Sequence, residues 1–172
     1  AVHRYPIIWS GKTLVNWTTL NLLPRYNLQG YNVGVSFIAH PIGGYHNGIE
    51  EAELYLRYIQ FACFSPIFLL ASEGGKYYKR EPWKWNPIIE NDIINFMNLR
   101  YKLIPYIYTE SYNYHKTGKG IVKPFYYDYP KILDDVQYKN QYFFGQNLFV
   151  SPITNKKNIV IDRVMKKIFV PD

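Results

Sequence analysis

Residues 33–45 read Val-Gly-Val-Ser-Phe-Ile-Ala-His-Pro-Ile-Gly-Gly-Tyr, an apolar run that ends in a glycine-rich loop. The run predicts a buried strand over residues 33–39. Residues 50–61 follow with apolar side chains at helical spacing and glutamates in the first turn, where the helix dipole favours them. A further apolar run over residues 66–71 predicts another strand. This order of strand, helix and strand indicates parallel strands joined by a helical crossover.

The same alternation extends toward the amino terminus. Residues 5–9 form a short apolar run before Ser10 and Gly11, which predicts a buried strand and a turn. Residues 13–23 carry leucine and tryptophan at helical spacing, and Pro24 is expected to end this helix. We therefore expect an α/β fold that starts with three strand–helix units.

Beyond residue 87 the pattern changes. Residues 88–116 predict a long helix, and Pro105 should break or kink it near residue 104 because proline lacks a backbone donor. Gly118 and Gly120 are expected to end it. Four extended segments follow, over residues 121–127, 147–153, 158–162 and 165–170. They predict a separate β unit, with the change near Phe144 and Gly145.

Composition excludes several classes of protein. The chain has 172 residues with 20 Lys+Arg and 13 Asp+Glu, a formal net charge of +7, but the basic residues are scattered rather than gathered on a stripe as in nucleic-acid binders. Aromatic residues make up 19% of the chain, which excludes a disordered protein. A single cysteine, Cys63, excludes a disulfide scaffold. No apolar run is long enough for a membrane span, and residues 1–6 show no signal peptide, so the expected location is cytoplasmic.

Short motifs spread along the chain carry a family resemblance. They are Trp9-Ser10-Gly11, His40 to Tyr45, Glu53 to Gln60, Phe64 to Ile67, Arg80 to Trp83 and Leu99 to Tyr106, with Tyr142 to Gly145 and Leu148 to Ile153 further on. Their order and spacing resemble glycoside hydrolase family 31. The resemblance implies a retaining α-glucosidase or a relative that acts on α-linked glucosides or xylosides, without a cofactor.

The resemblance also implies a (β/α)8 TIM barrel followed by β-domains. Such barrels have about 250 residues and rarely fewer than about 200, so this chain is too short to hold one. We expect the C-terminal portion of a barrel, about three β/α units, over residues 1–144, and the first strands of a β-sandwich over residues 145–172. The expected partner is the remainder of the barrel in a longer chain. The segment on which the family carries its aspartate nucleophile has no match here.

Retaining hydrolysis needs two carboxyl groups, one as nucleophile and one as acid/base. In family 31 the acid/base aspartate follows a Trp-x-Gly motif, and this chain has Lys12 at that position. An ordinary lysine has a pKa of about 10.4, and its cation would oppose the positive charge of the transition state. The resemblance therefore implies loss of the acid/base group.

The other strand ends show similar changes. At the positions of the family's sugar-binding Asp, Arg and His, this chain has Pro41, Leu69 and Ala71, none of which offers a polar side chain. Trp9 and Tyr45 retain aromatic rings that either stack on a sugar or pack in the core. Arg57 is expected to support the strand ends through hydrogen bonds.

Other polar residues near these motifs have ordinary interpretations. His40 and His46 are interpreted as loop histidines, Glu73 as a solvated loop charge, and Glu81 as part of a structural motif; no spacing indicates a metal site. We expect an α-glucoside or other carbohydrate as ligand, impaired or absent hydrolysis, and no nucleic-acid or membrane partner. The alternatives are a non-catalytic carbohydrate-binding or structural pseudoenzyme, an active enzyme completed by the rest of a longer chain, and a fragment that does not fold alone.

Overall fold

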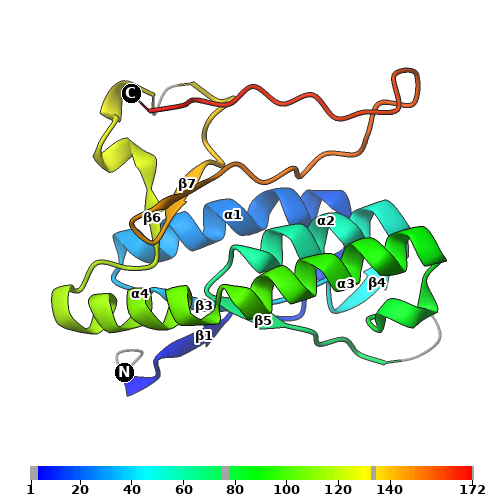
Figure 1. Cartoon of the computed structure of the whole chain (residues 1–172), viewed down its shortest axis with the longest axis horizontal. Helices are drawn as coiled ribbons and strands as arrows, with labels where there is room; N and C mark the ends of the chain where they lie inside the picture. Colours follow the sequence, from blue (N-terminus) through cyan, green and yellow to red (C-terminus); the bar gives the residue numbers. More distant parts are fainter. Residues whose placement is uncertain (1–3, 75–77, 133–134, 172) are drawn as a thin grey trace.

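The computed structural model describes residues 4–74, 78–132 and 135–171. Its central sheet consists of three parallel strands, β1 (Ile7–Trp9), β3 (Phe37–Pro41) and β5 (Ile67–Leu69), in the order β1-β3-β5. Figure 1 shows these strands beside helices α1 (Trp17–Asn32) and α2 (Ala52–Cys63). The predicted α/β alternation and the parallel pairing are confirmed.

Helix α1 differs from the prediction because it continues through Pro24 to Asn32. Asn16 caps its amino end, because the Asn16 side chain accepts a hydrogen bond from the Thr19 backbone N–H (2.7 Å). A proline inside a helix costs about 3 kcal/mol. Leu23 and Leu28 are both buried, and this packing on either side of the proline offsets that cost.

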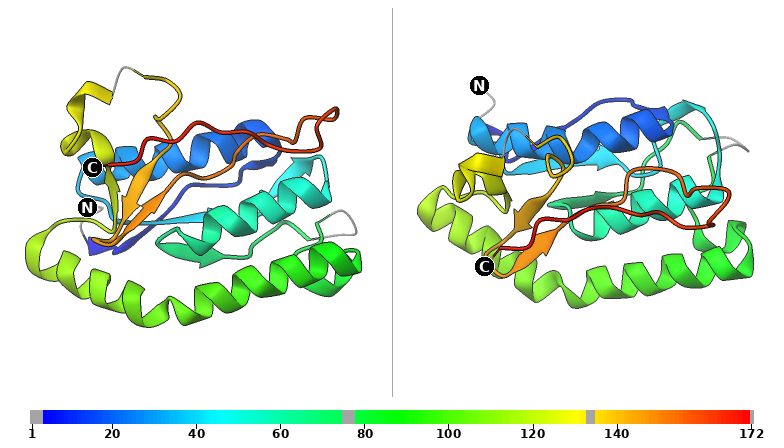
Figure 2. Two further views of the ribbon diagram at one scale, coloured as in Figure 1. Left: turned by 45° about the horizontal axis from the view of Figure 1, so that its top comes forward. Right: turned by 90° about the horizontal axis from the view of Figure 1, so that it is seen from above.

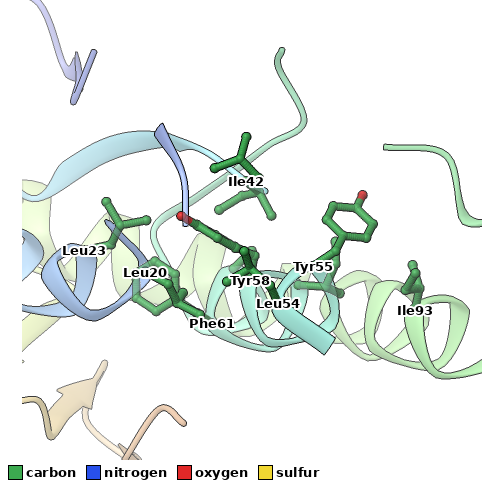
Figure 3. Packing of buried hydrophobic residues seen from close by; sticks show 11 residues of the cluster. Leu20, Leu23, Ile42, Leu54, Tyr55, Tyr58, Phe61 and Ile93 are labelled. Atoms are coloured by element: carbon green, nitrogen blue, oxygen red, sulfur yellow. The ribbon is translucent and has the colours of Figure 1, made fainter. Parts of the chain in front are cut away.

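The main core lies between the sheet and the helices. Its largest fully buried side chains include Leu20 and Leu23 from α1, and Tyr58 and Phe61 from α2 (Figure 3). Ile93 joins the same cluster from the next helix, α3 (Pro87–Lys102). The cluster thus packs α1 and α2, the helices that follow strands β1 and β3 of the parallel sheet, against each other and against the sheet.

The long predicted helix is two helices. Helix α3 is followed by α4 (Ile104–Thr117), with Leu103 between them, so the expected break beside Pro105 is confirmed. Figure 2 shows α3 and α4 running end to end along one edge of the molecule. A short 3-10 helix, η2 (Pro82–Lys84), precedes α3, and α4 ends at Gly118, as predicted.

An antiparallel sheet follows α4. Its strands are β6 (Val122–Pro124), β7 (Tyr142–Phe144) and β8 (Leu148–Val150), in that order. The 3-10 helices η3 (Phe125–Tyr127) and η4 (Pro130–Ile132) lie between β6 and β7. One sheet therefore joins strands from both sides of residue 144, and the division at residues 144 and 145 stays a prediction.

The last two predicted extended segments are wrong as strands. Residues 158–163 form a turn closed by pairing of Asn158 with Arg163, because Asn158 and Asp162 favour turn geometry. Residues 165–170 pair with no described strand. The Gln141 side chain holds this segment instead, donating to the Phe169 carbonyl (3.1 Å) and accepting from its N–H (2.9 Å).

Two further observations complete the fold. A small parallel pair, β2 (Leu14–Val15) and β4 (His46–Gly48), was not predicted. Within the described part of the chain, no helix is both long and apolar enough to cross a bilayer.

Candidate functional site

The carboxyl ends of the three parallel strands meet at one edge of the sheet. Trp9 at the end of β1 is in register with Ala39, and Pro41 at the end of β3 is in register with Leu69 at the end of β5. The loops after these strands therefore start side by side. Ligands of α/β proteins bind at this edge because several loops converge there.

Trp9, Lys12 and Tyr45 form a cluster at this edge. The rings of Trp9 and Tyr45 meet edge to face, with centroids 5.7 Å apart and planes at 64°. The Lys12 ammonium lies 5.3 Å from the centroid of the Tyr45 ring, within cation–π range. Trp9 is 44% exposed and Tyr45 is half-buried, so both rings reach solvent.

The small β2–β4 sheet fixes the loops that carry Lys12 and Tyr45. The Tyr45 N–H donates to the Thr13 carbonyl (2.7 Å), and a ring nitrogen of His46 is 3.2 Å from the Lys12 carbonyl. The Tyr45 carbonyl accepts from the Glu73 N–H (2.9 Å), which ties the loop after β5 to the same point. Backbone hydrogen bonds thus join the loops of all three strands.

Arg80 is the supporting residue that sequence reasoning missed. Its buried guanidinium donates to the carbonyls of Gly43 (3.1 Å) and Gly44 (2.9 Å), directly before Tyr45. The Tyr55 hydroxyl donates to the Arg80 carbonyl (2.6 Å), and burial raises the pKa of Tyr55. Burial also lowers the pKa of Arg80. The motif that contains Arg80 was noticed in the sequence, but nothing there indicated where its guanidinium binds.

Arg57, expected to support the strand ends, has its contacts elsewhere. Its guanidinium donates to Gln60 Oε1 (2.9 Å) and lies 3.9 Å from Glu53 Oε1, both on helix α2. The hydrogen bonds to the loop after β3 come from Arg80 instead.

The remaining predicted positions add little polarity. Pro41 is buried, and Leu69 and Ala71 are half-buried. The hydroxyl oxygens of Ser10 and Thr13 are buried without a hydrogen-bond partner among the described residues. Among the positions named here, the edge of the sheet is therefore mainly aromatic and apolar, and the exposed Lys12 adds a positive charge.

His40 corrects the interpretation as a loop residue. It lies in β3 and is fully buried, with a ring nitrogen 2.8 Å from Asn27 Oδ1 of α1. Burial lowers the pKa of His40 to about 3, so the ring is neutral at physiological pH. A neutral imidazole packed against Phe61 is a core residue rather than a ligand.

The two glutamates singled out after the third strand are an exposed loop residue and an ion-paired residue. Glu73 is exposed, and Glu81 forms an ion pair with Lys84 (2.8 Å). Among the described residues, no group of histidine, cysteine and carboxylate side chains could hold a metal ion.

Comparisons with known proteins agree with this geometry. The family model of the glycosyl hydrolases family 31 TIM-barrel domain matches residues 1–110. An alpha-xylosidase of Saccharolobus solfataricus is 30% identical over 152 residues, which cover 86% of this chain and 20% of the xylosidase. Neutral alpha-glucosidase C of Mus musculus is 29% identical over 160 residues, or 92% of this chain and 18% of the glucosidase. The chain thus spans about a fifth of the length of these relatives.

Solved structures show the same likeness. An uncharacterized Listeria monocytogenes protein, solved with glucose, magnesium and calcium, superposes with a TM-score of 0.80 at 28% identity, over 88% of this chain and 15% of that one. The cycloalternan-forming enzyme of Listeria monocytogenes, solved with a pentasaccharide substrate, gives a TM-score of 0.77 at 29% identity, over 88% and 15% of the two chains. From the strand-end geometry and these matches, the chain belongs to glycosyl hydrolase family 31.

Proposed function

We propose that this chain forms part of a family 31 sugar site that binds an α-glucoside without hydrolysing it. The observation that carries the proposal is the position of Lys12, whose ammonium lies over the Tyr45 ring beside Trp9. The family resemblance assigns the acid/base aspartate to this position. The site would thus keep its aromatic surface and lack its proton donor.

The chemistry at Lys12 supports loss of hydrolysis. Glycoside cleavage develops positive charge at the anomeric carbon, and a nearby ammonium destabilises that charge. General acid catalysis contributes about 10²–10⁴-fold to such reactions, so its loss alone is severe. Among the described residues near the strand ends, Glu81 is already paired with Lys84 and does not replace the missing acid.

The aromatic residues support retained binding. A sugar ring presents apolar C–H faces that pack against aromatic rings. Trp9 and Tyr45 are accessible from solvent, and the Tyr45 backbone is held by hydrogen bonds with Thr13 and Glu73. We therefore assign the first sugar of the ligand to the surface formed by Trp9 and Tyr45.

The finer fold assignment belongs to the same proposal. We assign residues 1–144 to the C-terminal portion of a (β/α)8 barrel, about three β/α units, and residues 145–172 to the start of a β-sandwich. In the described part of the chain, β1 and β5 are the edge strands of the parallel sheet, and such edges are usually covered.

Apolar grooves flank both edges. A groove of about 520 Å³ beside β5 is lined by residues that include Phe68, Leu70 and Tyr101. A second groove, of about 300 Å³, lies beside β1 and is lined by Ile8 and Val33, among others. The occupant we propose is the remainder of the barrel, because relatives in this family are about five times longer than this chain.

Tryptophan fluorescence tests the binding claim. Titration with methyl α-glucoside should quench fluorescence in the unmodified chain and should quench it much less in Trp9→Ala. Trp83→Ala is the matched control, because Trp83 is another exposed tryptophan (69%), on η2 and outside the Trp9–Tyr45 pair, and its removal should leave the response intact. Equal quenching in all three proteins would contradict binding at Trp9. Release of p-nitrophenol from its α-glucoside by the unmodified chain would contradict the loss of hydrolysis.

A further inference from the structure

Lys12 is a cation of the strand-end site without an acidic partner. Its ammonium lies 5.3 Å from the centroid of the Tyr45 ring, and its side chain is exposed. Among the described residues, no carboxylate oxygen lies within 4.0 Å of this ammonium. Four other lysines do form such ion pairs, namely Lys84, Lys123, Lys156 and Lys157. The positive charge of Lys12 is therefore available to a ligand.

The acidic residues of the neighbouring loops do not pair with this ammonium. Glu51 accepts a hydrogen bond from the Trp17 indole N–H (3.1 Å) and forms an ion pair with a lysine of the C-terminal segment. Glu50 accepts a hydrogen bond from a backbone N–H of the loop after β5. Glu73 contacts the site through its own backbone N–H, which donates to the Tyr45 carbonyl (2.9 Å), and its side chain is exposed. Within the described part of the chain, these loops thus place no carboxylate against the ammonium.

The place of Lys12 decides which part of a sugar its charge would meet. The general acid of a glycosidase protonates the glycosidic oxygen, so it lies beside the substituent on the anomeric carbon. The proposed function assigns this place to Lys12. Gly11, directly before it, has φ +99°, and apart from its chain neighbours a Cβ at this glycine would meet no atom within 4 Å. The space beside Lys12 is therefore open to a substituent on the sugar.

We infer that the ligand of this site is a sugar with an anionic group on its anomeric oxygen, as in an α-glycosyl phosphate; the inference rests on the proposed function. Hydrogen bonds between an ammonium and phosphate oxygens are about twice as strong as those between neutral groups. The ring of such a sugar would pack on the surface formed by Trp9 and Tyr45, and its phosphate would lie against Lys12. Lysine at the acid position then changes which sugar is bound, besides removing hydrolysis.

Three sugars that differ only in the place of the charge test this inference. In tryptophan fluorescence titrations at low ionic strength, α-glucose 1-phosphate should bind about fivefold more tightly than methyl α-glucoside, which is the effect of one exposed ion pair. Methyl α-glucoside 6-phosphate carries its charge on the far side of the sugar and should gain no such advantage. Sodium chloride at about 1 M should remove the preference, because it shortens the screening length to about 3 Å.

Variants at Lys12 separate a specific contact from the overall charge of the chain. Lys12→Met should abolish the preference for α-glucose 1-phosphate, and Lys12→Arg should keep it. Lys102→Met is the matched control, because it removes the same charge from α3 near the other end of the strands. Lys102 follows Arg100 closely, and the Arg100 guanidinium binds the carbonyls of Ser65 (2.6 Å) and Pro66 (2.9 Å) directly before β5. This control should leave the preference unchanged.

The possible outcomes distinguish this inference from the proposed function. The inference is overturned if α-glucose 1-phosphate binds no more tightly than methyl α-glucoside, or if Lys12→Met keeps the preference. It is also overturned if methyl α-glucoside 6-phosphate gains as much, or if inorganic phosphate competes as strongly as α-glucose 1-phosphate. In each of these cases, quenching by methyl α-glucoside that depends on Trp9 would still support the proposed function. No response to any of the sugars would contradict both.

Discussion

Replacement of Arg80 by leucine should destabilise the protein and disturb the site together. The guanidinium donates to the carbonyls of Gly43, Gly44 and Lys79 at 3.1, 2.9 and 2.9 Å. Leucine fills part of the space but leaves these carbonyls without their donor. Because the loop of Gly43 and Gly44 leads directly into Tyr45, the same change should weaken sugar binding.

The magnitude follows from the hydrogen bonds. A hydrogen bond to a charged group contributes about 1.5–3 kcal/mol, and the contacts to Gly43 and Gly44 are buried. The Lys79 carbonyl is only half-buried and can bind water instead. We therefore expect Arg80→Leu to lower the free energy of unfolding by about 3–5 kcal/mol. Arg80→Lys keeps the charge and one donor, and should lose about half of this amount.

Urea unfolding followed by circular dichroism measures this loss. With an m-value of about 2 kcal/mol/M, the midpoint should fall by about 2 M for Arg80→Leu. Arg57→Leu is the control, because its hydrogen bond and ion pair stay within helix α2, and should cost about 1 kcal/mol or less. Equal losses for the two variants, or a loss below about 1 kcal/mol for Arg80→Leu, would refute the reasoning.

Three further predictions concern stability and reactivity. Gly48→Ala should destabilise the protein in a thermal melt, because a Cβ there would lie 2.2 Å from the Val15 carbonyl oxygen at φ +107°; an unchanged melt would contradict the close approach. His40 has a folded pKa of about 3, below its usual 6.5, so the unfolded state binds the proton first and stability falls as pH drops from about 6.5 toward 3, by up to about 1.4 kcal/mol per pH unit. His40→Gln should flatten this dependence in pH-resolved urea titrations, and an equally steep curve in the variant would assign it to other groups. Cys63 is buried with its thiol pKa raised to about 11, so iodoacetamide should modify it far more slowly in the native protein than in urea, and equal rates would contradict its burial.

The sequence predicted the parallel part of the fold well, for physical reasons. The apolar run over residues 33–39 indicates a strand, and β3 (Phe37–Pro41) forms at its second half, where Ile38 and Ala39 are buried, whereas Val33 is 75% exposed in the turn before it. The helix break at Pro105 could also be predicted. A proline suits the first turn of a helix, where a backbone N–H would have no partner within the helix, and α4 begins at Ile104, directly before Pro105. Pro24 was misread by the same rule, since its local cost is offset by tertiary contacts of Leu23 and Leu28 that no local pattern reveals.

The proximity of Trp9 and Tyr45 could be predicted from the sequence, whereas the hydrogen bonds that support their loops could not. Strand ends in a parallel sheet converge, so Trp9 and Tyr45 could be placed together from their order in the chain. The hydrogen bonds of Arg80 to Gly43 and Gly44 join residues more than 35 positions apart, and their geometry depends on the folded loop.

Lys12 is the residue on which the proposed loss of hydrolysis depends most directly. The decisive measurement is release of p-nitrophenol from p-nitrophenyl α-glucoside by this chain supplemented with the preceding barrel segment of a family 31 relative, with Lys12 intact and as Lys12→Asp. We predict no release above buffer with Lys12 and measurable release with Lys12→Asp. Turnover with Lys12 intact would contradict the account, and so would equal inactivity of both proteins when the Trp9 fluorescence shows that sugar is bound.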